Sequence, residues 1–196
     1  MELSSKQIEQ FNKDGYIIFP ELFTSDEIEI FKNEVDRVSK IRSEMVVREG
    51  EDEAVKIMFQ LHEENVETAS PPFRTAARSP RILRTAQQCL GDEELYLHHS
   101  KLNMKSAIEG SAWPWHQDFH SWHLDGIKQP DMVTVTVVLT EASPINGCMY
   151  VLPGSHKQGR SDPRWDDSTA YKLWVAKTPD MKEYMKKFPA PVPITG

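Results

Sequence analysis

The hydrophobic pattern of the chain changes near Gly91, and this change limits the folds that the chain can adopt. Before Gly91, apolar residues recur at helical spacing behind helix-capping residues. After Gly91, short apolar or alternating runs are separated by turn residues, with no helix signal between consecutive runs. Strands joined in this way are typical of an antiparallel barrel or a jelly roll. We therefore expect a mainly β fold with N-terminal helices, in which residues 1–91 form a helical segment that packs on a barrel formed by residues 92–196.

Capping patterns mark the expected helix boundaries. Residues 4–7 and 24–27 each place a hydroxyl three residues before Gln or Glu, as in a capping box. Ser79 and Thr178 are each followed by a proline, which is favoured at the first helical position. These signals predict helices over residues 5–14, 25–42, 80–90 and 178–188.

The strand signals are short runs bounded by turn residues. They predict strands at Tyr16–Phe19, Glu94–Met104, Ala112–Asp118, Met132–Thr140 and Cys148–Leu152. Residues 43–78 show no clear pattern, and the charged run Arg48–Glu53 predicts a surface loop.

Charge and cysteine content exclude several classes of protein. The 30 acidic residues outnumber the 23 basic ones, for a net charge of -7, whereas a nucleic-acid-binding protein carries a basic stripe. Two cysteines, Cys89 and Cys148, are too few for a disulfide framework or a cysteine-type zinc site. No apolar run approaches the ~20 residues of a membrane span, and the N-terminus lacks a signal-peptide pattern. We expect a cytoplasmic protein without a membrane or nucleic-acid partner.

The densest group of chemically active residues is Trp113–His123. Within it, His116 and Asp118 are two residues apart, so on a strand their side chains share one face. An imidazole and a carboxylate that converge supply two of the three ligands of the facial triad that binds non-haem Fe(II). We therefore take His116 and Asp118 as the candidate catalytic and metal-binding residues. Hydrogen bonding of both side chains to the backbone at a barrel rim remains the alternative.

Other histidines compete for a role at this site. A second pair, His123 and Asp125, precedes Gly126 and is more typical of a turn. His120 shares the parity of His116, but four residues of strand span ~13 Å, so it reaches a common metal only if the chain folds back. His99 and His156 are further candidates for the third ligand, although substrate contact or a structural role is favoured for each.

An ordered set of motifs resembles the phytanoyl-CoA dioxygenase superfamily, and within it ectoine hydroxylase. The motifs run in order along residues 10–160, at 98–103, 115–119, 122–123, 146–148 and 152–157. The resemblance implies a double-stranded β-helix, of the jelly-roll or cupin-like type, and an oxygenase that requires Fe(II) and 2-oxoglutarate. It also matches His116 and Asp118 to the first two iron ligands. Because Asp118 is a carboxylate rather than a glycine, the resemblance implies hydroxylation rather than halogenation.

Two further groups are candidates for cofactor and substrate binding. Strand parity places His99, Lys101, Asn103 and Lys105 on one face, and this face either lines a ligand site or points to solvent. The resemblance assigns Lys105 and Lys101 to 2-oxoglutarate, and His99 replaces a glutamine that contacts ectoine. We expect Asn103 to contact the substrate as well.

Two other side chains complete the candidate set. Thr134 and Thr136 alternate with valines and can donate to a carboxylate, and we take Thr136 as a cofactor contact; a solvent-facing sheet surface is the alternative. Trp122 is a candidate wall of the substrate pocket, with a place in the core as the alternative.

The resemblance implies that the third iron ligand is a histidine well downstream of the turn at Pro153–Gly154, followed by a serine and an arginine that bind the cofactor. On this interpretation, the chain up to Gly196 lacks the distal histidine and the arginine. We expect a truncated barrel from a longer, active enzyme, with the 196-residue chain inactive alone. The expected partners are O2 and a small polar or zwitterionic substrate, such as an amino acid or imino acid, with ectoine not favoured. A non-catalytic jelly-roll module for ligand binding or interaction is the alternative. A cupin-like metal enzyme without 2-oxoglutarate remains only if Lys101 and Lys105 play no part in binding.

Overall fold

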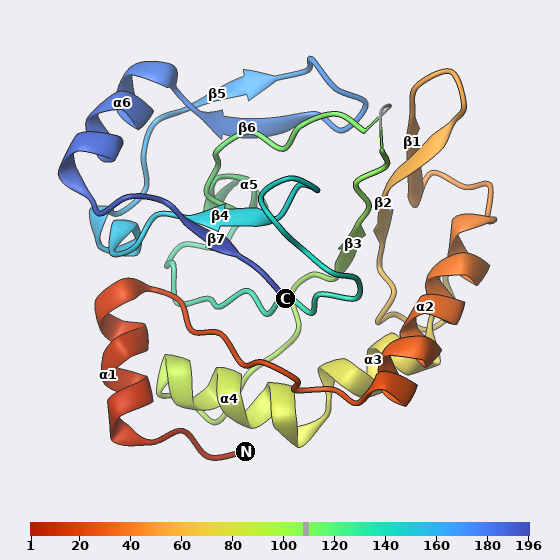
Figure 1. Ribbon diagram of the computed structural model, residues 1–196, viewed down its shortest axis with the longest axis horizontal. Coiled ribbons are helices and arrows are strands. Elements are labelled where there is room, and N and C mark those ends of the chain that lie inside the picture. The colour runs from red at the N-terminus through yellow and green to blue at the C-terminus, as the bar shows by residue number, and fades with distance from the viewer. Residues whose placement is uncertain (108–109) are drawn as a thin grey trace. The chain divides into compact units, whose positions relative to one another are not determined.

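The computed structural model describes residues 1–107 and 110–196 (Figure 1). These residues form two compact units. The first consists of Met1–Glu2, Phe19–Ser111 and Val135–Thr140, and the second of Leu3–Ile18, Ala112–Thr134 and Glu141–Gly196. The units interleave along the chain, whereas the sequence suggested one boundary near residue 91. The packing of residues 1–91 on a barrel stays a prediction.

The helices begin where the capping patterns predicted. The four expected helices are α1 (Ser5–Asp14), α2 (Ser25–Ser39), α4 (Pro80–Leu90) and α6 (Thr178–Lys187). Ser4 and Thr24 form complete capping boxes, and α1 and α4 end at left-handed glycines. Two short helices were not predicted: α3 (Pro71–Ala77) and α5 (Phe119–Leu124).

A three-stranded antiparallel sheet organises the first unit. Its strands are β1 (Val46–Glu49), β2 (Ala54–Phe59) and β3 (Lys101–Asn103), in the order β1-β2-β3. The pairing sets Met58 opposite both Val46 and Leu102. Figure 1 shows β1 and β2 as one hairpin with β3 beside β2.

The core of the first unit joins α2 to this sheet. Val35 and Val38 come from the apolar stripe of α2, and they pack with Val46, Met58 and Leu61. The i, i+3 spacing places the valines on one helical face, and burial of that face stabilises the helix more than propensity does.

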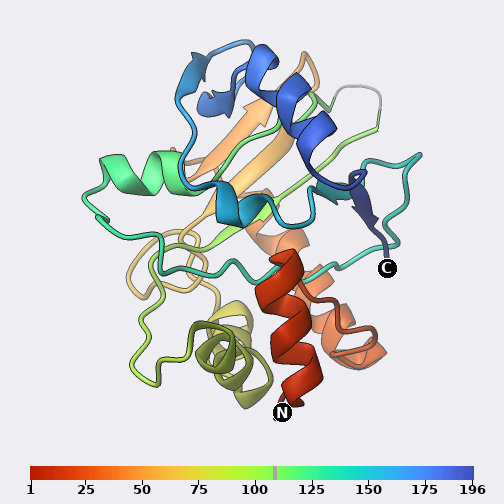
Figure 2. The ribbon, with the colours of Figure 1, turned by 90° about the vertical axis from the view of Figure 1, so that its left-hand side faces the viewer.

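Two separate two-stranded sheets form the sheet structure of the second unit. β4 (Met149–Val151) pairs with β7 (Val192–Ile194), and β5 (Pro163–Asp166) pairs with β6 (Leu173–Ala176), both antiparallel. The 3₁₀ helix η1 (Ser155–Gln158) precedes β5. Figure 2 shows the chain running from α6 into β7.

Several predicted strands are corrected by the structure. Residues 16–19, 112–118 and 132–140 contain no strand, and the run 94–104 is a strand only at Lys101–Asn103. Alternation favours a strand, but a strand also needs a neighbouring segment for its backbone hydrogen bonds. The described residues contain six α-helices and seven short strands.

The charged run Arg48–Glu53 is also corrected, because it is not a surface loop throughout. Glu49 belongs to β1, and its side chain is 8% exposed. It forms an ion pair with Lys56, which is 1% exposed, at 3.1 Å. No local pattern indicated this pairing, since both residues are polar and the pair forms only when β1 and β2 meet.

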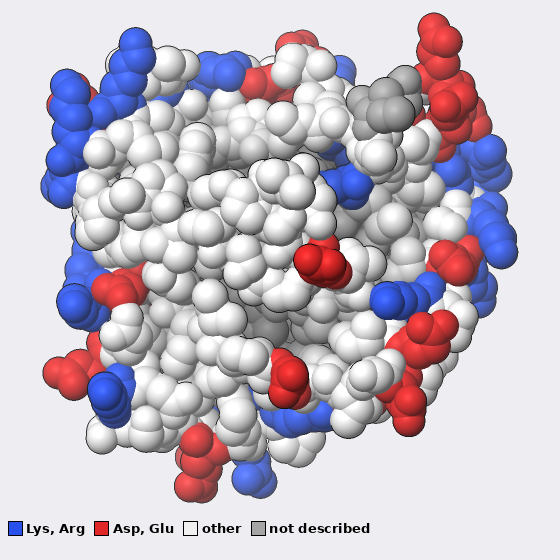
Figure 3. All heavy atoms as spheres, in the orientation of Figure 1, with Lys and Arg blue, Asp and Glu red and all other residues white. Residues whose placement is uncertain are grey.

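The surface of the described residues carries both signs of charge. Acidic and basic side chains are interspersed on the face drawn in Figure 3. None of the helices in residues 1–107 and 110–196 is long and apolar enough to cross a bilayer.

Candidate metal centre

His116 and Asp118 lie in contact at the start of α5. His116 Nε2 is 3.3 Å from Asp118 Oδ1, and each side chain is 26% exposed. The strand argument that predicted this convergence was wrong, because residues 112–118 form no strand and Asp118 is the residue that precedes the first turn of α5. The irregular path of the chain nevertheless brings the imidazole and the carboxylate together.

The backbone fixes which nitrogen of His116 faces the carboxylate. His116 Nδ1 is 2.7 Å from the carbonyl oxygen of Pro114, and because a carbonyl only accepts, Nδ1 donates. In the neutral ring this leaves a lone pair on Nε2, beside an acceptor oxygen of Asp118. Two acceptors at this distance are stabilised by a cation shared between them, either a proton or a metal ion. Metal-binding histidines usually donate one ring N–H to a carbonyl or carboxylate and bind the metal through the other ring nitrogen. His116 Nε2 and Asp118 Oδ1 therefore fit a ferrous ion.

Thr134 makes a further polar contact with Asp118. Its hydroxyl donates to Asp118 Oδ2 at 3.2 Å, on the oxygen that His116 does not face. The sequence singled out Thr134 as a donor to a carboxylate, but not to that of Asp118, which is sixteen residues away. Only the tertiary structure relates the two positions.

The third ligand is not supplied by the described residues. In residues 1–107 and 110–196, no group of three or more His, Cys, Asp or Glu side chains is arranged to bind a metal. His120 is buried against Ser161, and burial lowers the pKa of its imidazole. His156 lies within hydrogen-bond distance of the backbone oxygen of Asn12, and the ring of His99 is 5.8 Å from that of Phe59.

The predicted cofactor and substrate residues lie in both units. His99, Lys101, Asn103, Lys105 and Thr136 belong to the first unit, and Trp122, on α5, belongs to the second with His116 and Asp118. Around β3, Leu102 and Met104 pack against the core of the first unit, while Asn103 and Lys105 are exposed. This alternation agrees with the expected parity of the strand. Thr136 is exposed and outside any strand. The ligand-binding roles of these residues stay predictions.

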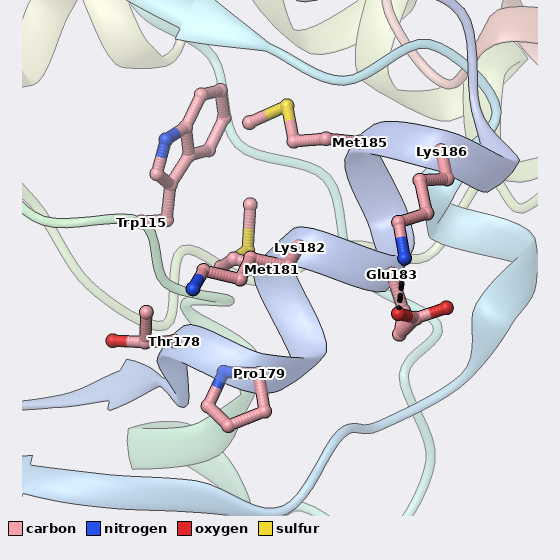
Figure 4. A pocket seen from close by; sticks show the side chains of 8 residues that line it. All are labelled: Trp115, Thr178, Pro179, Met181, Lys182, Glu183, Met185 and Lys186. Atoms are coloured by element: carbon pink, nitrogen blue, oxygen red, sulfur yellow. Dashed lines mark hydrogen bonds and ion pairs between the residues drawn. The ribbon is translucent and has the colours of Figure 1, made fainter.

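An apolar groove at Trp115 was not predicted. It lies between Trp115 and α6, and Figure 4 shows the indole of Trp115 near Met185, with Met181 on the same helix. The amide of Ala176 on β6 donates to the carbonyl of Trp115 at 2.8 Å. The three tryptophans in Trp113–His123 could have indicated an aromatic surface here, but the sequence does not show that α6 packs beside Trp115.

Known sequences resemble this chain over most of its length. The family model for phytanoyl-CoA dioxygenase (PhyH) matches residues 11–193. An ectoine dioxygenase from Bordetella bronchiseptica is 33% identical over 161 residues, which cover 80% of this chain and 50% of the relative. An L-proline trans-4-hydroxylase from Streptomyces griseoviridis is 32% identical over 151 residues, or 76% of this chain and 54% of the relative. The chain thus spans about half the length of the curated relatives it matches.

Solved structures give the same relationship. EctD from S. alaskensis, crystallised with 2-oxoglutarate and 5-hydroxyectoine, matches with a TM-score of 0.78 and 27% identity, covering 99% of this chain and 64% of that one. AviO1 from Streptomyces viridochromogenes, at 20% identity and a TM-score of 0.61, shares the fold. The motifs, the matched residues and the fold together show that the chain belongs to the phytanoyl-CoA dioxygenase (PhyH) family.

Proposed function

We propose that this chain carries the first two iron ligands of an Fe(II)- and 2-oxoglutarate-dependent dioxygenase that hydroxylates a small polar metabolite. The observation that carries the proposal is the contact of His116 Nε2 with Asp118 Oδ1, with the other ring nitrogen tied to Pro114. Support comes from the relatives, which are named as an ectoine dioxygenase and a proline hydroxylase, and from EctD structures with bound Fe and with 2-oxoglutarate.

Each side chain at the centre has a role in this proposal. His116 and Asp118 bind the metal, while the carbonyl of Pro114 and the hydroxyl of Thr134 keep the two donors in place. Bound Fe(II) with 2-oxoglutarate supplies the oxygen activation that hydroxylates a C–H bond. Lys105, Lys101 and Thr136 are the candidate 2-oxoglutarate contacts, since a carboxylate needs a cation or hydroxyl donors. His99, Asn103 and Trp122 are the candidate substrate contacts.

The substrate that we propose is an amino acid, an imino acid or an ectoine-like zwitterion. Polar candidates such as His99 and Asn103 suit a small charged molecule, and two named relatives act on molecules of this kind. The test is a screen of amino acids, proline and ectoine with the complete protein, followed by mass spectrometry. The expected product carries one added oxygen, and the absence of that product for every zwitterion would contradict the substrate class.

The metal site is tested separately, by anaerobic titration of the chain with Fe(II) and 2-oxoglutarate. We expect the weak visible charge-transfer band of the Fe(II)–2-oxoglutarate chelate, and we expect His116→Ala to abolish it. His156→Ala is the matched control, because the ring of His156 is hydrogen-bonded to the backbone of α1, at Asn12. A band that survives His116→Ala, or no band in the unchanged chain at saturating Fe(II) and 2-oxoglutarate, would contradict the proposal.

A non-catalytic module that binds a ligand or a partner is the second candidate function. It is favoured by the absence, in the described part of the chain, of a third metal-binding side chain at His116 and Asp118. Under this function, His116→Ala changes neither the spectrum nor ligand binding. The two candidates therefore differ in the same titration.

A further inference from the structure

Residues 159–161, in the loop between η1 and β5, contact the segment that carries His116 and Asp118. Gln117, which separates the two candidate ligands, donates from Nε2 to the carbonyl of Gly159 at 2.9 Å. Its Oε1 accepts from the backbone amide of Ser161 at 3.0 Å and from the Ser161 hydroxyl at 3.3 Å. Both ends of one amide side chain are therefore bonded to the same loop.

His120 makes a second attachment to this loop from the first turn of α5. Its side chain is 1% exposed, and its Nε2 lies 2.9 Å from the carbonyl oxygen of Ser161 and 3.1 Å from the Ser161 hydroxyl. Because the carbonyl only accepts, Nε2 carries a proton and donates it. Nδ1 has no hydrogen-bond partner among the described residues, so the buried ring keeps its place through Nε2 and through packing.

These contacts matter because no strand ladder holds the segment. Residues 112–118 have no regular secondary structure, and the amide of Ala176 provides one backbone bond, to Trp115. Metal affinity depends on donor positions within about 0.5 Å, and residues that fix donors contribute strongly to it. In an irregular segment, side-chain attachments on both sides of Asp118 add to the bonds from Pro114 and Thr134 in fixing them.

We propose that Gln117 and His120 are positioning residues that fix the separation of His116 and Asp118 by anchoring their segment to loop 159–161. This inference rests on the proposed function, since it assigns a purpose to the contact between the two candidate ligands. It concerns neither metal contact nor catalysis by Gln117 and His120 themselves.

The test compares Ni²⁺ binding by the 196-residue chain and its variants, measured by titration calorimetry, with thermal unfolding measured in parallel. Ni²⁺ alone is the probe, because it is stable in air and binds N and O donors more tightly than Fe²⁺. Gln117→Met and His120→Leu remove the anchors while keeping volume, and we expect each to weaken Ni²⁺ binding about tenfold. His120→Gln keeps a donor toward Ser161, and we expect it to retain most of the affinity.

A second readout separates positioning from general stability. In the unchanged chain, nitrogen NMR of the His116 ring should show Nδ1 protonated and hydrogen-bonded to Pro114, and the anchor variants should show this hydrogen bond weakened. His156→Gln is the matched control, a histidine of the same unit whose hydrogen bond lies elsewhere, and it should change neither readout.

The possible outcomes lead to different conclusions. If folded Gln117→Met keeps the Ni²⁺ affinity and the His116 Nδ1 signal of the unchanged chain, the inference is overturned. Gln117 is half-buried, so this variant decides between the outcomes if His120→Leu does not fold. Equal losses in His120→Gln and His120→Leu would also overturn it, because the donor would then be irrelevant. If His116→Ala leaves Ni²⁺ binding unchanged, the proposed function fails instead.

Discussion

The carboxylate of Asp118 receives a hydroxyl hydrogen bond on one oxygen and faces an imidazole with the other. Thr134→Val removes the hydroxyl with little change in volume. A hydrogen bond of this kind contributes about 1 kcal/mol, so we expect Ni²⁺ binding to weaken about fivefold. Titration calorimetry measures the change, and Thr134→Ser, which keeps the hydroxyl, should bind as the unchanged chain does. Equal affinities for the valine and serine variants would contradict a role for this hydroxyl.

Lys56 and Glu49 form a buried ion pair, and Ser111 is hydrogen-bonded to both side chains. The amide of Ser111 donates to Glu49 at 3.0 Å, and its hydroxyl contacts both charged groups. Burial acts to raise the pKa of Glu49, but the hydrogen bonds from Ser111 and Lys56 outweigh it and the pKa is lowered. The carboxylate therefore stays charged and needs its partner.

Removing one member of this ion pair should lower the stability of the fold. We expect Lys56→Met to lower the free energy of unfolding by about 3 kcal/mol or more, because it leaves a buried carboxylate without a cation. Lys56→Met combined with Glu49→Gln removes both charges and keeps an acceptor for Ser111, so most of the loss should be recovered. Urea unfolding measures both variants. A double variant no more stable than Lys56→Met would show that the charge is not the cause.

At the scale of elements, helix boundaries follow local chemistry, as the end of α1 illustrates. Gly15 has a φ of +82° and its amide donates to Phe11. A Cβ atom at Gly15 would lie 2.3 Å from Nδ1 of His156. The turn that carries His156 also contacts α1, because the amide of Gly154 donates to the carbonyl of Asp14. The Pro153–His156 motif, which the sequence indicated only as a turn, thus covers the end of a helix.

Gly15→Ala should therefore destabilise the chain for two reasons. The left-handed backbone costs about 1–2 kcal/mol for a residue with a Cβ, and displacement of the His156 ring adds to this. Gly91→Ala is the matched control, because Gly91 also has a positive φ but a Cβ atom there would meet no described atom within 4 Å. Thermal unfolding should show a larger loss for Gly15→Ala, and equal losses would exclude a contribution from His156.

The start of α2 predicts a pH dependence. Glu27 accepts from the amide of Thr24 at 2.8 Å and pairs with Arg81 of α4. The hydrogen bond from Arg81, followed by that from Thr24, lowers the pKa of Glu27 from 4.5 to about 2. Because the folded pKa is below the unfolded one, this stabilisation is complete above about 4.5 and is lost as the pH falls toward about 2.

Glu27→Gln should consequently show a shallower loss of thermal stability than the unchanged chain over that pH range. Glu51→Gln, at an exposed position, controls for the change in net charge. Unfolding temperatures measured from about pH 6 to about pH 2 provide the comparison. Parallel curves for Glu27→Gln and the unchanged chain would contradict the lowered pKa.

For the whole molecule, the number of metal-binding side chains decides the expected activity. Two candidate ligands meet at the candidate centre, and the described residues supply no third, whereas a facial triad needs three. We expect the 196-residue chain alone to release no succinate from 2-oxoglutarate in the presence of Fe(II) and O2. The ectoine dioxygenase of Bordetella bronchiseptica, assayed with ectoine, is the positive control. Robust turnover by the 196-residue chain would contradict this expectation.

The sequence by itself determined the helix starts at Ser4 and Thr24, the glycine stops of α1 and α4, and the pairing of His116 with Asp118 as candidate ligands. These depend on interactions within a few residues, or on motifs that a family keeps in order. Tertiary structure alone decided that residues 112–118 form no strand, that Thr134 reaches Asp118, and that loop 159–161 anchors Gln117 and His120. The physical reason is that strands and polar contacts need partners from distant parts of the chain, and local patterns do not encode which distant segment will be the neighbour.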